Sequence, residues 1–336
     1  MQRVWHGDQC EEDQDDAYWK GHKGAYKNIG KRSARAGLEI SYMYLGHMIT
    51  EDVASLKEEA DSRSTKSCVA DQAEKGFASN GDRYDAHRPG YTDEAVELIA
   101  KAITATMGTL DGGAVQYNVL ELGAGTGKLT QQLAPKLPKS IAYLATEPSR
   151  NFLDTLEAKG LGVDTALASV GSLSLPEGSV ETVVCAQCFH WFCDAQSVEI
   201  IRRIMAPGGK LIMVWNVNNM EDAWMKPMGE QRFEVISRVG GSFVHVVNTG
   251  EWQKAIDASP SFTQESILNI AGNNVVGDLD KILSNIATIS AYNMLPEAER
   301  KSYLGKLRET IANWPGVDVQ NVTMLMNTLL ATYVAV

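Results

Sequence analysis

No stretch of the sequence approaches the roughly 20 apolar residues that a membrane-spanning helix needs, and the N-terminus lacks the apolar core of a signal peptide. An excess of positive charge is also missing, because 31 Lys and Arg face 42 Asp and Glu for a net charge of -11. General nucleic-acid binding needs clustered basic side chains against phosphates. We therefore expect a cytoplasmic protein with a small-molecule substrate as its partner, no nucleic acid and no membrane, in an oligomeric state that the sequence leaves open.

Cysteine is scarce, and its five copies have no spacing typical of a disulfide framework, which suits a reducing compartment. Cys185, Cys188 and Cys193 do surround His190, as zinc ligands could. However, Cys185 ends an apolar run, where cysteine usually packs as a small hydrophobe, and a second ligand pair at zinc spacing is missing. We expect no metal.

Residues 1–78 differ from the rest of the chain because they separate their charges into blocks. An acidic run covers residues 11–16, and a basic stretch without acids covers residues 20–37. Segregated charge with few apolar residues is typical of a solvated or disordered arm. We expect a charged, disordered N-terminal extension over 1–78 and one domain over 79–336.

Three glycines at alternate positions, Gly123, Gly125 and Gly127, follow the apolar run 119–122 and precede an amphipathic stretch at 129–133. This order predicts a strand, a glycine turn and a helix, with a small ligand close to the turn's backbone. A phosphate-binding P-loop is excluded, because Leu122 and Leu129 stand where it needs Gly and Ser or Thr. The dinucleotide fingerprint fails by one residue, since its third glycine comes early, and a nucleotide-dependent oxidoreductase stays open as an alternative.

The spacing Glu-x-Gly-x-Gly-x-Gly from Glu121 to Gly127 resembles motif I of the class I S-adenosylmethionine-dependent methyltransferases. This resemblance implies a Rossmann-like, doubly wound α/β sheet of seven strands with an antiparallel C-terminal hairpin. It also implies S-adenosyl-L-methionine as cofactor, lying over the glycine turn. The residues that it assigns to the cofactor there are Glu121, Gly123, Ala124, Gly125 and Gly127.

A second acidic residue, Glu147, ends the expected second strand 20 residues beyond Gly127, where a fixed carboxylate can accept both hydroxyls of a ribose. Pro148 follows it. Gly171, Ser172 and Leu173 occupy the place where many relatives carry an acid for the adenine amino group. The resemblance therefore leaves adenine to backbone groups, Ser172 and the Leu173 side chain.

Two further segments resemble the small-molecule methyltransferases of the trans-aconitate type, in the methyltransferase type 11 group. Tyr84, Arg88, Pro89 and Tyr91 match a Tyr-x-x-x-Arg-Pro-x-Tyr signature that covers the cofactor in those relatives. Residues 186–192 match their Ala-Gln-x-Phe-His-Trp-Phe string at the carboxyl end of the fourth strand. The candidate sites that follow are Gln187 for the cofactor, Tyr84, Arg88, His190, Trp191, Trp215 and Tyr292 for the substrate, and His190 for catalysis.

The last third of the chain is more helical, and we expect helices at 223–239, 251–258, 279–291 and 296–313 as insertions on the acceptor side within 217–315. Strands at 262–270 and 322–334 would complete the sheet. His190 could remove a proton from an acceptor or, when protonated, hold an acceptor carboxylate. The expected function is methyl transfer to a small molecule, with a carboxylate as the first acceptor considered. The alternatives are S-methylation of a small thiol or thioether and a non-catalytic partner subunit.

Overall fold

A computed structural model of the chain describes residues 85, 88–110, 115–221, 223–238, 247 and 250–336. The expected extension over 1–78 and the candidate residue Tyr84 lie outside these ranges. Within them, none of the helices has the length and apolarity to span a bilayer.

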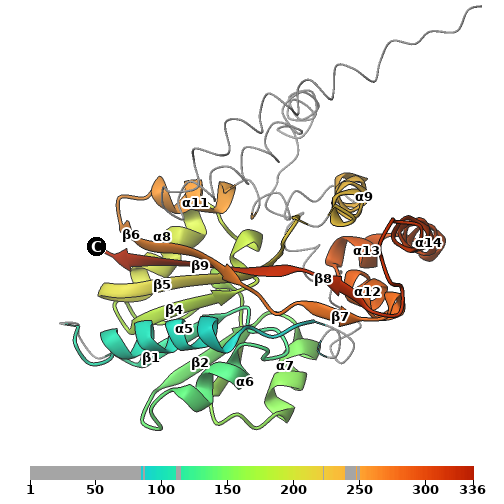
Figure 1. The fold of residues 1–336 in the computed structure, drawn as a ribbon. Helices are drawn as coiled ribbons and strands as arrows, with labels where there is room; N and C mark the ends of the chain where they lie inside the picture. The colour runs from blue at the N-terminus through green and yellow to red at the C-terminus, as the bar shows by residue number, and fades with distance from the viewer. Residues whose placement is uncertain (1–84, 86–87, 111–114, 222, 239–246, 248–249) are drawn as a thin grey trace, which may run out of the picture. The chain divides into compact units, whose positions relative to one another are not determined.

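A seven-stranded sheet in the order β3-β2-β1-β4-β5-β9-β6 forms the centre of the fold (Figure 1). Strands β1 to β5 are parallel, and β9 runs antiparallel to both of its neighbours. This arrangement confirms the predicted Rossmann-like sheet. The strands are β1 (Tyr117–Leu122), β2 (Tyr143–Glu147), β3 (Asp164–Leu167), β4 (Val180–Ala186), β5 (Met205–Asn218), β6 (Phe262–Ala271) and β9 (Met326–Ala335).

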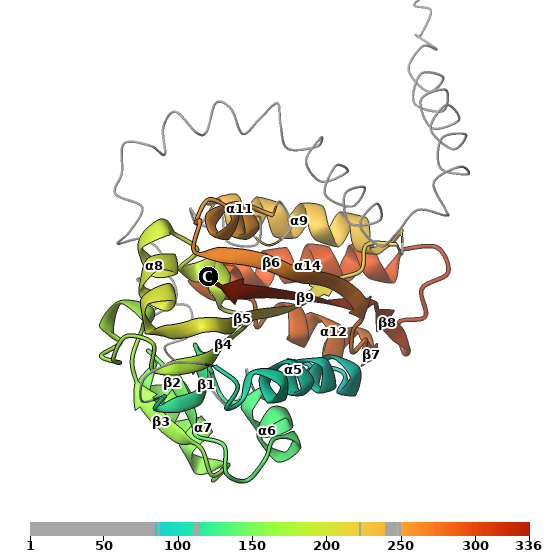
Figure 2. The same cartoon turned by 90° about the vertical axis from the view of Figure 1, so that its left-hand side faces the viewer.

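Helices cover both faces of the sheet, which is why the central strands are apolar on both sides (Figure 2). On one face, α5 packs its buried Ile99 and Ile103 with Val184 of β4 and Ile212 of β5. The opposite face carries α8 and α11, and Trp252 of α11 lies on Trp215 of β5 with ring centroids 4.9 Å apart. The helices are α5 (Asp93–Thr106), α6 (Thr130–Leu133), α7 (Arg150–Ala158), α8 (Ala195–Ile204) and α11 (Glu251–Asp257).

The expected turn at 206–209 lies inside β5 as an irregularity. Pairing with β4 shifts register between Val180 and Thr182, and Gly208 takes a φ of 78°. A side chain at Gly209 would meet the carbonyl oxygen of Glu181 at 2.5 Å. The glycines therefore let the chain bulge against β4 before regular pairing begins at Lys210.

The predicted strand over 322–334 is two strands, β8 (Val322–Met324) and β9, and β6 continues likewise into β7 (Val275–Gly277). β7 and β8 pair antiparallel in a separate two-stranded sheet, which extends the β6–β9 pair. Asn274 Oδ1 accepts the backbone N–H of Met326 at the junction. The antiparallel hairpin is confirmed, with helices inserted between its strands.

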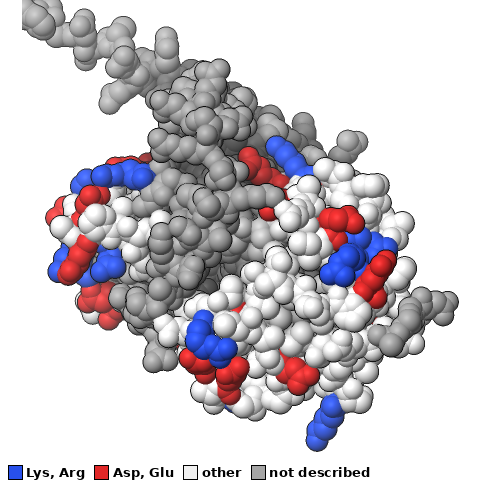
Figure 3. Space-filling model, turned by 180° about the vertical axis from the view of Figure 1, so that it is seen from behind, with Lys and Arg blue, Asp and Glu red and all other residues white. Residues whose placement is uncertain are grey.

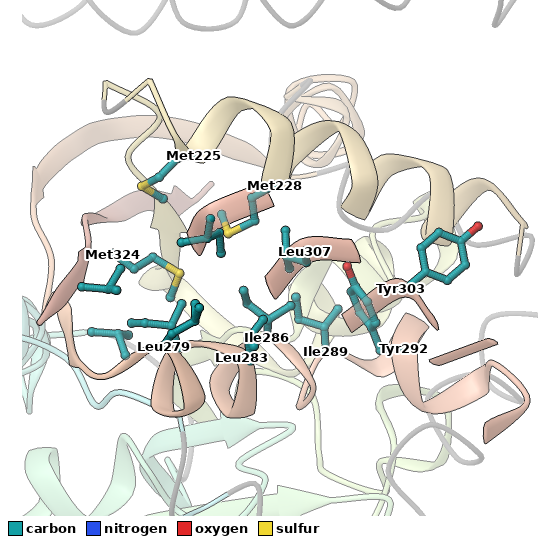
Figure 4. Close-up of a cluster of buried hydrophobic side chains, with 14 of the residues drawn as sticks. Met225, Met228, Leu279, Leu283, Ile286, Ile289, Tyr292, Tyr303, Leu307 and Met324 are labelled. Atoms are coloured by element: carbon teal, nitrogen blue, oxygen red, sulfur yellow. The ribbon is translucent and has the colours of Figure 1, made fainter. Parts of the chain in front are cut away.

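Four helices and the β7–β8 pair form what we call the cap. Its helices are α9 (Met225–Arg238), α12 (Leu279–Ile286), α13 (Ser290–Met294) and α14 (Glu297–Ala312). They share an apolar cluster of their own, which includes Met228, Ile282 and Leu307 (Figure 4). The cap lies beyond the end at which β5 finishes and β9 begins (Figure 1). The expected helix over 279–291 is thus two helices, and its place on the acceptor side stays a prediction.

Charged side chains of the described residues form small mixed groups on the face shown in Figure 3, with Lys and Arg beside Asp and Glu. Lys136 lies 3.5 Å from Asp93, and Arg150 lies 3.2 Å from Asp154. Such exposed pairs contribute little to stability.

Candidate functional site

The three glycines of the turn after β1 all have positive φ, at 60°, 60° and 81°, but they meet different surroundings. A side-chain carbon on Gly123 would lie 2.9 Å from Cβ of Cys188, and one on Gly127 would lie 2.4 Å from Leu156. At Gly125 the nearest atom would be a Phe152 ring carbon, 3.9 Å away. A side chain at Gly123 or Gly127 would therefore collide with a neighbour, whereas one at Gly125 would make only ordinary contact with Phe152.

Glu147 ends β2 with its side chain only 6% exposed and directed at the turn. One carboxylate oxygen accepts the backbone N–H of Gly125 at 2.8 Å, and the other accepts that of Ser149 at 2.9 Å. Burial raises its pKa, and these two hydrogen bonds oppose the rise. Each oxygen keeps a second acceptor site, so the carboxylate can still receive two hydroxyls.

Glu121 lies in β1 and is completely buried. Its Oε2 accepts hydrogen bonds from Thr130 and Tyr143, while Oε1 has no partner among the described residues. Burial raises the pKa of this carboxyl to about 7, against the hydrogen bonds from Tyr143 and Thr130 and together with the charge of Glu147. A buried acceptor left open in this way fits a cationic group of a ligand.

Asp85 fastens the segment before α5 to the glycine turn. Its Oδ1 accepts from Thr126 Oγ1 at 2.7 Å and from Lys159 Nζ at 3.0 Å, and Lys128 Nζ lies 3.7 Å away. Burial alone would raise the pKa of Asp85, but the bonds from Thr126 and Lys159 and the two lysine charges hold it below its ordinary value.

Residues 88–91 run across the carboxyl edge of the sheet. Gln132 brackets Tyr91, accepting its N–H and donating to its carbonyl, both at 2.8 Å. The carbonyl of Gly90 accepts from Asn216 and from Asn273, each at 3.2 Å. These bonds tie the predicted Arg-Pro-x-Tyr segment to the ends of β5 and β6.

His190 lies in a short 3-10 helix (Phe189–Trp191) directly after β4. Its Nδ1 accepts the indole N–H of Trp215 at 3.1 Å. Burial, together with the charges of Arg232 and Arg88, lowers the pKa of His190 to about 3. Because an indole nitrogen only donates, Nδ1 is the acceptor nitrogen and the neutral ring carries its proton on Nε2.

Arg232 of the cap acts electrostatically on His190, and Tyr292 of the cap acts on Arg232. Burial lowers the pKa of Arg232 to about 10, the charge of Arg88 adds to this, and Tyr292 opposes it. Burial raises the pKa of Tyr292 to about 12, so its phenol is neutral at pH 7. The fold therefore brings Arg88 and His190, which are separate in the sequence, within electrostatic reach of Arg232, and Tyr292 interacts with Arg232.

Other predicted residues are placed less tightly. Ser172 is exposed and bonds with its own turn, accepting from Ser169 N–H at 2.9 Å, with Leu173 half-buried beside it. Pro148 is exposed, whereas Ala124 is buried and donates its N–H to Thr146. Their assignment to the cofactor stays a prediction.

Gln187 follows β4 with a φ of 60°, a left-handed conformation that a residue with a side chain adopts at a cost. Its amide donates to the carbonyl of Asn216 at 3.2 Å. Trp191 is half-buried with its ring 5.1 Å from that of His190. Trp215 is only 1% exposed, and its ring contacts His190 and Trp252.

Several residues of this site were not predicted from the sequence. Asp85 was the nearest to detection, because it lies inside the recognised segment, and Asn216 directly follows Trp215. Arg232 gave no signal, since a single arginine in a helix is usually exposed. In the described part of the chain no group of three or more His, Cys, Asp or Glu side chains is arranged to hold a metal ion.

Comparison with known proteins finds similarity to methyltransferases. A family model described as a methyltransferase domain matches residues 119–209. An uncharacterised methyltransferase of Schizosaccharomyces pombe is 27% identical over 236 residues, which is 69% of this chain and 85% of the relative. A second, methyltransferase-like protein of that yeast is 33% identical over 156 residues, covering 46% of this chain and 57% of the relative. The solved YcgJ protein of Bacillus subtilis matches 73% of this chain and 99% of its own, at 14% identity and a TM-score of 0.42.

The motif spacing, the strand order and the matched domain point to the same class. Residues 119–209 match a methyltransferase domain, and the sheet around them has a Rossmann-like strand order.

Proposed function

We propose that the enzyme transfers a methyl group from S-adenosyl-L-methionine to a carboxylate oxygen of a small organic acid. The proposal rests above all on His190, whose state decides which acceptors need no help from the protein.

The residues present fit the proposed cofactor. Gly125 has no close neighbour over its backbone, where the cofactor would lie. Glu147 would accept the ribose hydroxyls, and the unpaired Oε1 of Glu121 would accept the ammonium of the amino-acid tail, directly or through water. The backbone and side chain of Leu173 would border the adenine. When bound, the cofactor supplies a methyl group already activated by the positive sulfonium.

Acceptor chemistry follows from the protonation of His190. Its Nδ1 is engaged by Trp215 and its Nε2 carries the proton, so the neutral ring donates a hydrogen bond and offers no free basic nitrogen. Tyr292 is a neutral phenol at pH 7. A hydroxyl or amine would need a proton acceptor, whereas a carboxylate is already ionised and needs none.

The roles of the acceptor-side residues are therefore binding and alignment. His190 Nε2–H would donate to the acceptor, Trp191 would border it, and Arg88 would attract its negative charge. Trp215 acts through His190 by fixing its ring. Alignment of this kind can contribute on the order of 7–11 kcal/mol to a two-reactant reaction.

A labelled-methyl assay tests the proposal. The protein is given methyl-labelled cofactor and a panel of small carboxylic acids, thiols, thioethers and alcohols, and the labelled product is identified. We expect a methyl ester. Calorimetry should show S-adenosylhomocysteine binding and no NAD binding, and the opposite result would return the chain to the oxidoreductase alternative.

His190 variants separate a donor from a base. His190→Asn keeps an N–H donor and should retain more turnover than His190→Ala, while both keep cofactor affinity. Because the pKa of His190 lies near 3, kcat should show no histidine-dependent change between pH 5.5 and 8. Equal inactivation of the two variants, together with a kcat limb near pH 6–7 that persists in Glu121→Gln, would restore the general-base role.

A further inference from the structure

The inner face of α9 carries one charged residue. Met225, Met228 and Val235 are buried, and the steps between them place all three on one side of a helix. Figure 4 shows Met225 and Met228 directed at the apolar cluster of the cap. Arg232 comes four residues after Met228 and three before Val235, so it falls within the same buried stripe.

The surroundings of Arg232 offer it no negative charge in the described part of the chain. Its Nε is enclosed and makes no hydrogen bond there. The groups that act on it electrostatically are the cation Arg88 and the phenol of Tyr292, which is neutral at pH 7. Arg232 as a whole is half-buried, but a guanidinium with an enclosed Nε and no counter-charge among the described residues is costly, so its place on an apolar face calls for an anion.

The other charged residues of α9 point elsewhere. Glu234 accepts the hydroxyl of Tyr303 at 2.7 Å, and Arg238 pairs with Glu299 of α14 at 2.9 Å. Lys226 and Glu230 are exposed. Arg232 thus differs from these neighbours. They contact α14 or solvent, whereas Arg232 acts on His190, the residue predicted to bind the acceptor.

We propose that Arg232 binds a carboxylate of the acceptor and, with Arg88, holds it between the cap and the segment 88–91. A guanidinium matches a carboxylate through two parallel N–H donors, and the Nε2–H of His190 can donate to the same ligand. This inference rests on the proposed function and adds to it the residue that selects for an acidic acceptor.

Binding and stability measurements on the full-length chain test it, with saturating S-adenosylhomocysteine present. The probes are benzoate, succinate and citrate, with phosphate and sulfate as other anions. Arg232→Gln should weaken the tightest carboxylate by about tenfold to a hundredfold. Arg238→Gln, the matched control on the exposed face of α9, should leave that affinity unchanged.

Stability without acceptor provides a second readout. Because Arg232 lacks a counter-charge, Arg232→Met should melt a few degrees higher than the wild type while losing the stabilisation by carboxylates. Arg232→Lys should keep the charge but not the paired donors, and should bind with intermediate affinity.

Three results would overturn the assignment. The first is a carboxylate affinity that Arg232→Gln does not change. The second is a lower melting temperature for Arg232→Met, which would make Arg232 a structural residue. The third is Arg232-dependent binding of phosphate and sulfate that equals the binding of carboxylates. Failure to bind S-adenosylhomocysteine would instead contradict the proposed function, so the two failures are distinguishable.

Discussion

At the scale of single residues, Glu121 combines the motif's first acid with an unsatisfied buried oxygen. Its pKa of about 7 means that the folded protein holds a proton that the unfolded chain would release at lower pH. The raised pKa lowers the stability of the fold at pH values above the ordinary pKa of a glutamate. A cation from the cofactor would offset this loss.

The pH dependence of stability should report this cost. Below about pH 4.5 the carboxyl is protonated in both states. Between there and about pH 7 only the unfolded chain releases the proton, so stability falls as pH rises, by up to about 3 kcal/mol. Glu121→Gln should make the decline shallower, as measured by urea unfolding at pH 5 and pH 8. Parallel curves for the two proteins would contradict the assigned pKa.

Residues of this kind differ in how far the sequence predicts them. The glycine turn and Glu147 follow from spacing, because a strand end and the turn after it are adjacent in sequence and in space. Arg232 is separated from His190 by 42 residues, and its meeting with Arg88 depends on how the cap packs. The sequence also could not predict the tautomer of His190, because it depends on a hydrogen bond from Trp215 of β5.

At the scale of elements, Asp85 is bonded to the glycine turn, and Gly90 and Tyr91 are bonded by Asn216, Asn273 and Gln132. Asp85 lies at the side of the site that would hold the cofactor, and Arg88 lies at the side that would hold the acceptor. The sequence motif predicted that its segment covers the cofactor, and the bonds give it a physical means of doing so.

Weakening this attachment should loosen the cofactor. Asp85→Asn keeps an acceptor for Thr126 but loses the charge that pairs with Lys159 and Lys128. Such partly exposed pairs contribute about 1 kcal/mol or less. We expect S-adenosylhomocysteine affinity to fall by up to about fivefold in 50 mM salt, and by less in 0.5 M salt because charges are screened.

The control for this prediction is Asp154→Asn, which removes an exposed pair with Arg150 on α7. Its affinity should stay at the wild-type value. The lowered pKa of Asp85 means that its attachment is present above the ordinary aspartate range and is lost as pH falls below it. An Asp85→Asn protein that binds as tightly as the wild type at low salt would show that the segment is held by its other bonds alone.

The boundaries of elements show what sequence patterns leave undetermined. A continuous apolar run over 322–334 reads as one strand, but the chain leaves the main sheet at Leu325, where β8 pairs with β7 instead of β6. The helix expected over 279–291 is interrupted at Ile289, which takes an extended backbone before α13. Both breaks follow from the packing of the cap against the sheet rather than from local propensity.

At the scale of the whole described fold, two separate apolar clusters support different parts of the structure. One lies between the sheet and α5, α6 and α7, beneath the glycine turn, and the other lies inside the cap. No residue belongs to the buried sets of both clusters as they are described. The cofactor side and the acceptor side of the site therefore rest on different cores.

Matched cavities should separate these two sides. Leu307 in the cap and Leu133 in α6 are both fully buried, and either Leu→Ala change should cost about 2–5 kcal/mol. Leu307→Ala should reduce turnover and hydrogen-exchange protection in α9 and α14 while leaving S-adenosylhomocysteine affinity near wild type. Leu133→Ala, beside the glycine turn, should weaken that affinity. Equal loss of cofactor affinity in both variants would mean that the cap and the sheet unfold as one unit and that the acceptor side has no stability of its own.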